Sequence, residues 1–317
     1  MVSGLYGMLY ALYFRSYRGW KMRSSKLWEV IFRLNLVVFW KFLSGAYLRS
    51  LEKGKEYGLN QKPREQKVIA SLTTFPKRID KVWIAIETIM RQTEKPDMIE
   101  LWLAQEQFPG GLESLPDSLK EQMQRGLSVR FCQDLRSHKK YYFAMQEHPD
   151  AVVITFDDDI FYPRDTVQKL IELHRKHPEQ VIGMSCPKFT ENDFLVPLNW
   201  DMQMGESVAQ QNLGVCGCAG TLFPPQALHP NAFEIENIKK LCFLADDLWL
   251  TAMTYMNGKQ LASVGRLPFP ISVPDTQEEA LTATNNSAAA EINNNTQWEA
   301  VLNHYQEELK QWRETLQ

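Results

Sequence analysis

The stretch AVVITFDDDIFYP, residues 151–163, decides the fold. It opens with a continuous run of apolar and β-branched residues, which is typical of a strand buried on both faces of a sheet. Three adjacent aspartates, Asp157, Asp158 and Asp159, follow the run directly, and Pro163 ends the stretch. In open α/β sheets, ligands bind beyond the carboxyl ends of the strands. The stretch therefore predicts a buried strand with a binding site at its end.

The three aspartates are strained unless a positive charge lies beside them, because like charges raise each other's pKa. A divalent cation relieves that strain, and carboxylate oxygens are hard ligands of the kind that Mg²⁺ and Mn²⁺ prefer. The strand context thus indicates a metal site at the edge of a sheet, where the ion would hold a substrate phosphate. The alternative is a solvated loop end, with Asp165 serving as a favourable charge at the start of the following helix.

Composition places the chain among soluble globular enzymes. It has 317 residues, a mass of 36.8 kDa, 44% hydrophobic residues and 23% charged residues. These values allow one large domain or two small ones with a sizeable core. The net charge of −3 argues against nucleic acid as the main partner. The charge is uneven, because residues 1–50 carry eight cations and one acid, a net charge of +7, which leaves −10 for the remainder.

The five cysteines are odd in number and lie among apolar residues, which favours reduced core thiols in a cytosolic protein. Cys216 and Cys218 are separated by one glycine. Zinc sites commonly use the spacing C-x₂₋₄-C with a second pair of ligands. The spacing therefore disfavours a zinc site at these two cysteines.

The first 50 residues are basic and aromatic. Residues 5–14 are apolar, but no positively charged segment precedes them and no small-residue cleavage site follows, so a secretory signal is not expected. Charged residues interrupt the apolar stretch 26–48, which argues against a membrane span. On a helix, its polar residues share a stripe of about 120°. Such a basic amphipathic helix either lies in the interface of an anionic membrane or packs on the main domain.

Strands and helices alternate through the middle of the chain. The expected strands are Val68–Leu72, Met98–Leu103, Leu127–Cys132, 151–156 and Val181–Cys186, and the expected helices lie within 81–91, 115–125, 134–146 and 166–176. Alternation at this spacing is typical of βαβ units with a parallel sheet. We expect an α/β fold with a mostly parallel, Rossmann-like sheet flanked by helices. A charged linker at 51–66 divides the chain into a basic helical segment, 1–65, and a main domain, 66–317.

Two later segments complete the pattern. Leu213–Phe223, interpreted as a strand, contains three glycines, which let the backbone approach another backbone or a ligand closely. A helix follows with Asp246 and Asp247 at its start, where the helix dipole favours carboxylates. The dipole explains Asp246 and leaves Asp247 less well explained. The remaining expectations are a mobile loop over residues 272–296 and a final amphipathic helix over residues 298–316.

Together these features resemble the glycosyltransferases with the GT-A fold, which use a nucleotide-diphosphate sugar. Their order is most similar to the exostosin-like transferase domain and to bacterial family-2-like sugar transferases. The resemblance covers roughly residues 66–265 and rests on three blocks: KKYY at 139–142 before the aspartate strand, GCAGT at 217–221, and ADD at 245–247. The aspartate run corresponds to the DXD motif of these enzymes. The chain has Ala-Asp-Asp where such families commonly have Glu-Asp, which leaves the division of roles within this pair open.

The resemblance implies a role for each acid. Sugar transfer breaks the bond between the anomeric carbon and the diphosphate, and a divalent metal on the phosphates acts as a Lewis acid. Asp159 is implied as the direct metal ligand, with Asp157 as a second ligand or a partner of the ribose or donor sugar. Asp158 is implied as a donor-site residue that hydrogen-bonds locally. Asp247, with Asp246 beside it, is implied as the catalytic carboxylate, either a general base in an inverting enzyme or a group that positions the sugar in a retaining one.

The resemblance also implies contacts to the nucleotide. Thr73, Pro76 and Arg78, after the first strand, would lie near the base and ribose. Lys139 or Lys140 would contact the nucleotide, because a cation just before the aspartate strand is a feature of the family. The alternative for these cations is a solvated surface.

The implied activity is that of a hexosyl- or N-acetylhexosaminyl-transferase with Mn²⁺ or Mg²⁺ as cofactor. The donor would be a nucleotide-diphosphate sugar, UDP-sugar first among them, and the acceptor a glycan or glycolipid. The implied setting is cell-surface polysaccharide synthesis at the cytoplasmic face of the cell membrane. Two alternatives remain: a sugar-phosphate nucleotidyltransferase, although the turn at 73–78 has no glycine, and a non-catalytic membrane-associated binding protein, although both groups of acids are intact.

Overall fold

The computed structural model describes residues 56–203, 205–265, 271–276, 285, 287 and 290–316, together with residues 26–28, 30, 31, 34, 50 and 51. By its internal contacts the chain forms two units, Met1–Glu56 and Tyr57–Gln317. Most of the first unit, including most of the expected amphipathic helix at 26–48, lies outside the described residues. Among those that are described, no helix combines the length and the apolar character needed to cross a membrane.

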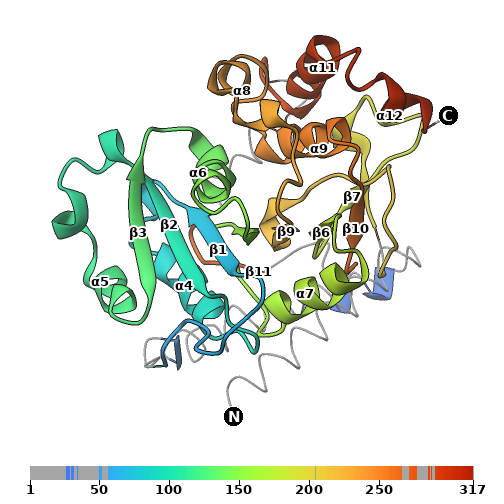
Figure 1. Ribbon diagram of the computed structural model, residues 1–317. Helices are drawn as coiled ribbons and strands as arrows, with labels where there is room; N and C mark the ends of the chain where they lie inside the picture. The colour runs from blue at the N-terminus through green and yellow to red at the C-terminus, as the bar shows by residue number, and fades with distance from the viewer. Residues whose placement is uncertain are drawn as a thin grey trace. The chain divides into compact units, whose positions relative to one another are not determined.

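A seven-stranded sheet forms the centre of the second unit (Figure 1). β1 pairs in parallel with β4 and β2, β2 with β3, and β6 with β10. All residues of β4 are buried, as expected for a central strand with layers on both faces. From one edge of the sheet to the other, the order is β10 (Leu261–Ser263), β6 (Val181–Gly183), β9 (Thr221–Phe223), β4 (Val152–Phe156), β1 (Val68–Thr73), β2 (Met98–Ala104) and β3 (Leu127–Cys132).

Strand β9 runs antiparallel to both of its neighbours, β4 and β6. Thr155, near the end of β4, pairs with Thr221, at the start of β9. The segment that enters β9 therefore lies at the same edge of the sheet as the residues that leave β4. This reversal brings the glycine-rich segment and the aspartate run together.

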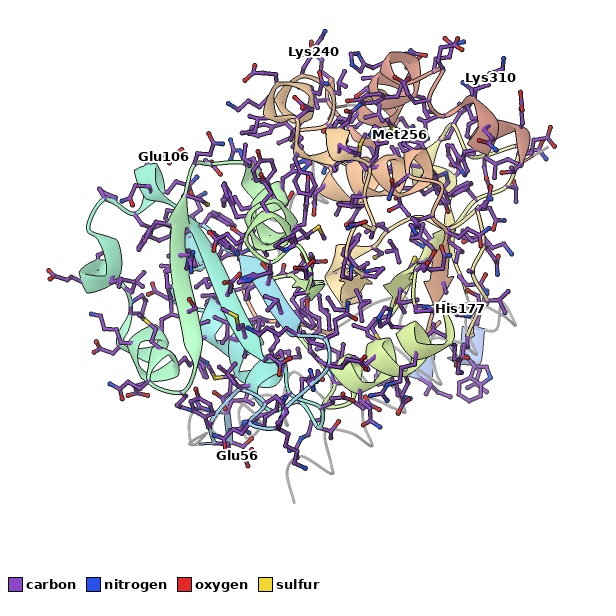
Figure 2. All side chains as sticks on the ribbon, in the orientation of Figure 1. Glu56, Glu106, His177, Lys240, Met256 and Lys310 are labelled. Carbon is purple, nitrogen blue, oxygen red and sulfur yellow. The ribbon has the colours of Figure 1, made fainter. Side chains whose placement is uncertain are left out.

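Helices cover both faces of this sheet, and Figure 2 shows the side chains that fill the layers. One face carries α4 (Val82–Met90), α5 (Asp117–Met123) and α7 (Thr166–Lys176), which pack on alternate strand residues. On the other face, α6 (Lys139–Glu147) lies over β1, β2 and β4. A further core joins β6, β9 and β10 to the C-terminal helices α8 (Ile235–Leu241), α9 (Asp246–Met256), α11 (Asn294–His304) and α12 (Lys310–Glu314).

The predicted α/β fold, with a mostly parallel sheet flanked by helices, is confirmed. Three segments differ from the expectation. The strand expected over Val181–Cys186 ends at Gly183. Only Thr221–Phe223 of the glycine-rich segment is a strand, because residues 217–219 form a tight turn. The expected final helix is two helices, α11 and α12, that are separated after His304.

A buried acid, Glu87, joins α4 to the connection between α5 and β3. It is 1% exposed, and its carboxylate lies 2.7 Å from Arg91 Nε and 2.6 Å from Arg125 Nη1. Removing one member of a buried ion pair leaves its partners uncompensated and costs about 3–5 kcal/mol. Glu87 therefore stabilises this corner of the sheet although it is an acid in a largely apolar layer.

We expect Glu87→Ala to lower the free energy of unfolding by about 3 kcal/mol, because both arginines lose their carboxylate. Urea unfolding followed by circular dichroism measures the change. Glu206→Ala is the matched control, since Glu206 pairs with Lys176 at 2.7 Å but is 57% exposed, and its loss should cost less than about 1 kcal/mol. Equal losses in the two variants would contradict the explanation by burial.

Candidate active site

Asp157, Asp158 and Asp159 lie at the carboxyl edge of the sheet, between β4 and the short strand β5 (Ile160–Phe161). Asp158 and Asp159 are buried, whereas the side chain of Asp157 is 29% exposed. The buried run of β4 fixes this position, because the strand ends at Phe156 and the chain turns directly after it. The acids are therefore at the edge where the sequence predicts a site, and Asp157 is the most accessible of the three.

Arg78 neutralises two of the acids. Its Nη1 lies 2.6 Å from Asp158 Oδ1 and 3.1 Å from Asp159 Oδ2. The hydroxyl of Thr74 donates to the other carboxylate oxygen of Asp158 at 2.5 Å. Burial raises the pKa of the Asp158 carboxyl above its usual range, although Arg78 acts in the opposite direction. Both oxygens of Asp158 are thus occupied by donors of the protein.

Residues 271–276 cross the same acids from a distant part of the sequence. β11 (Ile271–Ser272) pairs antiparallel with β5, and the backbone N–H of Val273 donates to the carbonyl of Asp159 at 2.6 Å. Arg78 Nη2 donates to the carbonyl of Thr276 at 2.7 Å. This segment therefore holds both the backbone of Asp159 and the guanidinium that neutralises its side chain.

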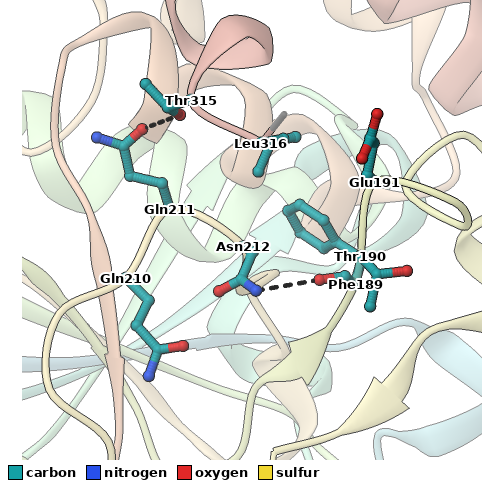
Figure 3. A pocket seen from close by; sticks show the side chains of 8 residues that line it. All are labelled: Phe189, Thr190, Glu191, Gln210, Gln211, Asn212, Thr315 and Leu316. Carbon is teal, nitrogen blue, oxygen red and sulfur yellow. Dashed lines mark hydrogen bonds between the residues drawn. The ribbon is translucent and has the colours of Figure 1, made fainter.

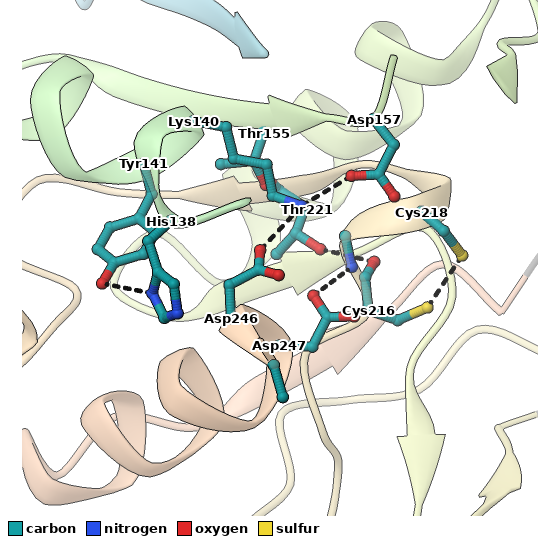
Figure 4. Close-up of polar contacts among 12 residues, drawn as sticks. His138, Lys140, Tyr141, Thr155, Asp157, Cys216, Cys218, Thr221, Asp246 and Asp247 are labelled. Atoms are coloured by element: carbon teal, nitrogen blue, oxygen red, sulfur yellow. Dashed lines mark hydrogen bonds and ion pairs between the residues drawn. The ribbon is translucent and has the colours of Figure 1, made fainter. Parts of the chain in front are cut away.

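Lys140, in α6, joins the end of β4 to the start of α9 (Figure 4). Its Nζ lies 2.7 Å from Asp157 Oδ1 and 2.9 Å from Asp246 Oδ2, and the lysine is 3% exposed. Burial alone would lower the pKa of this ammonium group, but the carboxylates of Asp157 and Asp246 outweigh burial and hold that pKa well above its usual range. Lys140 is therefore a fixed positive charge among the acids.

The two acids at the start of α9 have different environments. Burial would raise the pKa of Asp246, but the charge of Lys140, together with smaller contributions from its other neighbours, holds that pKa below its usual range. Asp247 accepts a hydrogen bond from the backbone N–H of Gly217 at 2.8 Å. Burial and then the charge of Asp246 raise the pKa of Asp247 to about 8. Asp246 is thus a permanent anion, whereas Asp247 exchanges a proton near neutral pH.

Gly217 brings the glycine-rich turn against these groups. A side-chain carbon on this residue would lie 2.7 Å from Lys140 Nζ and 3.0 Å from Asp247 Oδ1, so glycine is needed for the close approach. Gly220, with φ of 100°, then directs the chain into β9. The turn therefore fixes the orientation of Asp247 through a backbone donor.

Two predicted donor-site residues have other partners. Thr73 donates its hydroxyl to the carbonyl of Trp102 at 2.7 Å, and Lys139 Nζ lies 2.6 Å from Asp134 Oδ1. Arg78 and Lys140, in contrast, form ion pairs with residues of the acid cluster. The structure thus brings together Arg78, Lys140 and all five predicted acids, while Thr73 and Lys139 bind to groups outside that cluster.

Sequence reasoning missed three residues that position the acids. Thr74 holds Asp158, Gly217 holds Asp247, and the hydroxyl of Tyr162 accepts the backbone N–H of Asp157 at 2.7 Å. Thr74 directly follows β1, where the alternation of side chains between the two faces of the sheet ends. That position could have identified Thr74 from the sequence. Gly217 had a signal too, because its glycine-rich segment was expected to allow a close approach, but its partner Asp247 was not predictable. Tyr162 had no comparable signal, because its contact depends on the turn geometry around β5.

The acid cluster carries an excess of negative charge that a divalent cation would balance. Its net charge is −3 when all five carboxyls are ionised against Arg78 and Lys140, and −2 when Asp247 holds a proton. Excess negative charge on oxygen ligands fits Mg²⁺ or Mn²⁺. Asp157 uses Oδ1 for Lys140 and is the most exposed of the run, so Asp157 and Asp159, two positions further along, are the residues that would hold the ion.

A second group with metal-ligand chemistry lies near the other end of α6. Ligand atoms of Glu100, Glu147 and His148 lie within 4.8 Å of one another. Glu147 forms an ion pair with Arg130, and Glu100 Oε1 lies 3.1 Å from His148 Nε2. Each carboxylate of this group therefore has a nitrogen partner, and the group contains two carboxylates against the five of the acid cluster.

A hollow of about 450 Å³ lies beside the C-terminal helix α12 (Figure 3). None of the predicted site residues lines it. Two of its amide side chains bond within the protein, since Gln211 accepts from the hydroxyl of Thr315 and Asn212 donates to the carbonyl of Phe189. This hollow is thus separate from the acid cluster.

The fold and the acid cluster define an α/β protein with an acidic site at the carboxyl edge of its sheet. No model of a known protein family matches the chain, and no curated protein sequence matches it. Among solved structures, the chain is similar to a mannosyltransferase from Pyrobaculum calidifontis in complex with GDP-Man and Mn²⁺. That match has a TM-score of 0.41 and 14% sequence identity, and it covers 87% of this chain and 71% of the other. At this level of similarity, the chemistry has to be inferred from the side chains of the site.

We expect Asp247→Asn to remove a pH-dependent loss of stability. An unfolded aspartate titrates near pH 4, whereas folding raises the pKa of Asp247 to about 8. The folded state therefore binds the extra proton between these values, and stability falls as pH rises from about 4 to about 8. The variant should gain about 1–5 kcal/mol over the wild type at pH 8 and little at pH 4.

Urea unfolding at both pH values measures this gain. Asp246→Asn is the matched control and should change stability with the opposite sign, because the pKa of Asp246 is lowered and its carboxylate balances the buried Lys140. A gain for Asp247→Asn that is the same at pH 4 and pH 8 would show that its carboxyl is not protonated by burial.

Proposed function

We propose that the chain is a metal-dependent glycosyltransferase of the GT-A type that moves a sugar from a nucleotide-diphosphate donor to a glycan or glycolipid. The observation that carries the proposal is the convergence of four aspartates on two cations at the carboxyl edge of the sheet, with Asp247 as a fifth acid beside them. The unbalanced negative charge suits a divalent ion and, through it, a diphosphate. A UDP-sugar donor, a hexosyl or N-acetylhexosaminyl group and a role in cell-surface polysaccharide synthesis belong to the same proposal.

In this proposal, Asp157 and Asp159 hold Mn²⁺ or Mg²⁺, which when bound supplies a Lewis acid for the departing diphosphate. Arg78 keeps Asp158 and Asp159 in place. Lys140 adds a fixed positive charge where negative charge develops on the leaving group, and its ion pairs preorganise that charge before the donor binds.

Asp247 is the group that we assign to the sugar centre or the acceptor hydroxyl. With a pKa of about 8 it accepts a proton near neutral pH, and the N–H of Gly217 fixes its orientation. In an inverting reaction it acts as the general base, and in a retaining reaction the same carboxylate positions the sugar. Asp246 keeps Lys140 in the charged state beside it.

We expect UDP to bind the purified chain in the presence of Mn²⁺, and at least about tenfold more weakly when Mn²⁺ is removed with a chelator. Asp159→Ala should bind UDP at least about tenfold more weakly with Mn²⁺ present, because a metal ligand is lost, and should not unfold, because a like charge is also removed. Isothermal titration calorimetry measures both effects.

Asp165→Ala is the control for this experiment. Asp165 is an acid close to the aspartate run, but its side chain is one-third exposed and lies 3.9 Å from Lys169, so its loss should leave UDP binding unchanged. If the affinity for UDP changed neither on removal of Mn²⁺ nor in Asp159→Ala, the assignment of the metal site would be wrong. Binding of GDP, CDP or dTDP in place of UDP would change the donor, and release of diphosphate from a nucleoside triphosphate would indicate a nucleotidyltransferase.

We also propose that the basic segment 1–50, with a net charge of +7, attaches the protein to the cytoplasmic face of an anionic membrane. The opposite charge of the remaining chain, −10, makes attachment through the main domain unfavourable. This segment is therefore the part of the chain that we assign to peripheral membrane contact.

Deleting residues 1–50 should abolish cosedimentation of the protein with vesicles that contain anionic lipid and leave UDP binding unchanged, since the acid cluster lies wholly within the second unit. Vesicles of zwitterionic lipid alone are the control and should retain less of the full chain. Undiminished cosedimentation after the deletion would rule out attachment through this segment.

A further inference from the structure

The turn that positions Asp247 contains two cysteines whose sulfurs nearly touch (Figure 4). Cys216 Sγ and Cys218 Sγ lie 3.2 Å apart. Both residues are partly exposed, whereas Cys186 and Cys242 are buried. A disulfide has an S–S distance of about 2.05 Å, so the two sulfurs need to approach by only roughly 1 Å to form one.

We propose that Cys216 and Cys218 form an oxidative modification site, at which a peroxide converts the two thiols to a disulfide and thereby detaches Gly217 from Asp247. The disulfide and its effect on Gly217 stand on the geometry of the turn. Its consequence for activity rests on the proposed function.

The environment of Cys218 decides the order of the two attacks. Its bond to Cys216, and then burial, raise the pKa of the Cys218 thiol well above its usual range, which leaves little thiolate at Cys218 near neutral pH. Because the thiolate is the nucleophile, we assign the attack on the oxidant to Cys216 and the second attack to Cys218.

The chemistry balances with a peroxide as the oxidant. The Cys216 thiolate attacks one peroxide oxygen, the O–O bond breaks, and a sulfenic acid forms while water or an alcohol leaves. The sulfur of Cys218 then attacks the sulfenic sulfur, the S–O bond breaks, and the hydroxyl leaves as water with the proton of Cys218. The peroxide takes up the two electrons that the thiols lose.

The new bond acts on Asp247 through the backbone of Gly217. It closes a small ring that contains the N, Cα and carbonyl C atoms of Gly217 and that has to accommodate a Cβ–S–S–Cβ dihedral near 90°. Both ends of the turn are anchored, since the carbonyl of Cys216 accepts from Thr221 and that of Cys218 accepts from Tyr162. The adjustment therefore falls on Gly217, whose N–H holds Asp247 at 2.8 Å.

The site is selective among the cysteines of the chain. Cys132 is partly exposed, but burial raises the pKa of its thiol to about 12, which leaves little thiolate near neutral pH. Cys186 is buried, and burial raises the pKa of its thiol to about 12 as well. A peroxide at low concentration should thus oxidise the pair in the turn first.

The test treats the reduced full-length protein with hydrogen peroxide and analyses it by intact mass and peptide mapping. We expect the loss of two hydrogens, a cross-link between Cys216 and Cys218, and its reversal by dithiothreitol. Cys218→Ser has no resolving thiol and should accumulate a sulfenic acid at Cys216 that dimedone traps. Cys132→Ser is the matched control and should form the same cross-link as the wild type.

Amide hydrogen exchange then tests the coupling without reference to activity. We expect exchange at Gly217 to become at least about tenfold faster in the oxidised protein, because its acceptor is lost. No cross-link between these two cysteines, or a cross-link with unchanged exchange at Gly217, would overturn the proposal. Loss of UDP-sugar turnover on oxidation tests the regulatory consequence, and a reduced protein without turnover would count against the proposed function and not against the disulfide.

Discussion

The arrangement of the site depends on one buried ammonium group. Lys140 is shared between Asp157, at the end of β4, and Asp246, at the start of α9. An unpaired charge at this depth would be very unfavourable, so α6, β4 and α9 have to meet at Lys140 Nζ. The same atom explains the glycine at position 217, because a side chain there would occupy its space. The fold and the site are therefore connected through a single nitrogen.

Charge then determines how the acids differ. Arg78 forms ion pairs with Asp158 and with one oxygen of Asp159. Lys140 forms ion pairs with one oxygen of Asp157 and with Asp246. Asp247 has a backbone N–H as its hydrogen-bond donor, and burial, followed by the charge of Asp246, raises its pKa to about 8. Five residues of one chemical type thus acquire different environments: Asp246 is a fixed anion, Asp157 is partly exposed, and the pKa of Asp247 is raised to about 8. This separation is typical of sites where burial and neighbours, more than residue type, decide function.

Much of the fold was predictable because its signals are local. Two examples are the β-branched run of β4 and the helical periodicity of α4, which depend on residues that are neighbours in the sequence. The structure confirms both elements. The direction of β9 was not predictable, because no local pattern separates a parallel from an antiparallel central strand. The expected strand is also shortened to Thr221–Phe223, because residues 217–219 form a tight turn.

The candidate site was predictable in its residue types and less so in its contacts. The run of aspartates and the pair at the start of α9 stood out by charge in an apolar context. The choice between Lys139 and Lys140 could not be made from sequence, because adjacent helical residues point about 100° apart and only the packing of α6 decides which one faces the acids. The contact between Cys216 and Cys218 was equally unpredictable. Their spacing disfavours a zinc site, but only the geometry of the turn brings their sulfurs to 3.2 Å.

The segment 271–276 has a consequence for the way in which the molecule is made. The carbonyl of Thr276 accepts a hydrogen bond from Arg78, which lies 198 positions earlier in the sequence. The ion pair between Lys140 and Asp246 forms only when most strands of the sheet have been synthesised. Contacts between such distant positions form slowly, since the intervening chain must first be ordered. On a ribosome the N-terminal strands emerge first, so the nascent protein carries its aspartate run for some time with an incomplete set of partners. The acidic edge thus depends on the late segment 271–276, and a cation that bound the aspartates early would stabilise their charges until those partners form.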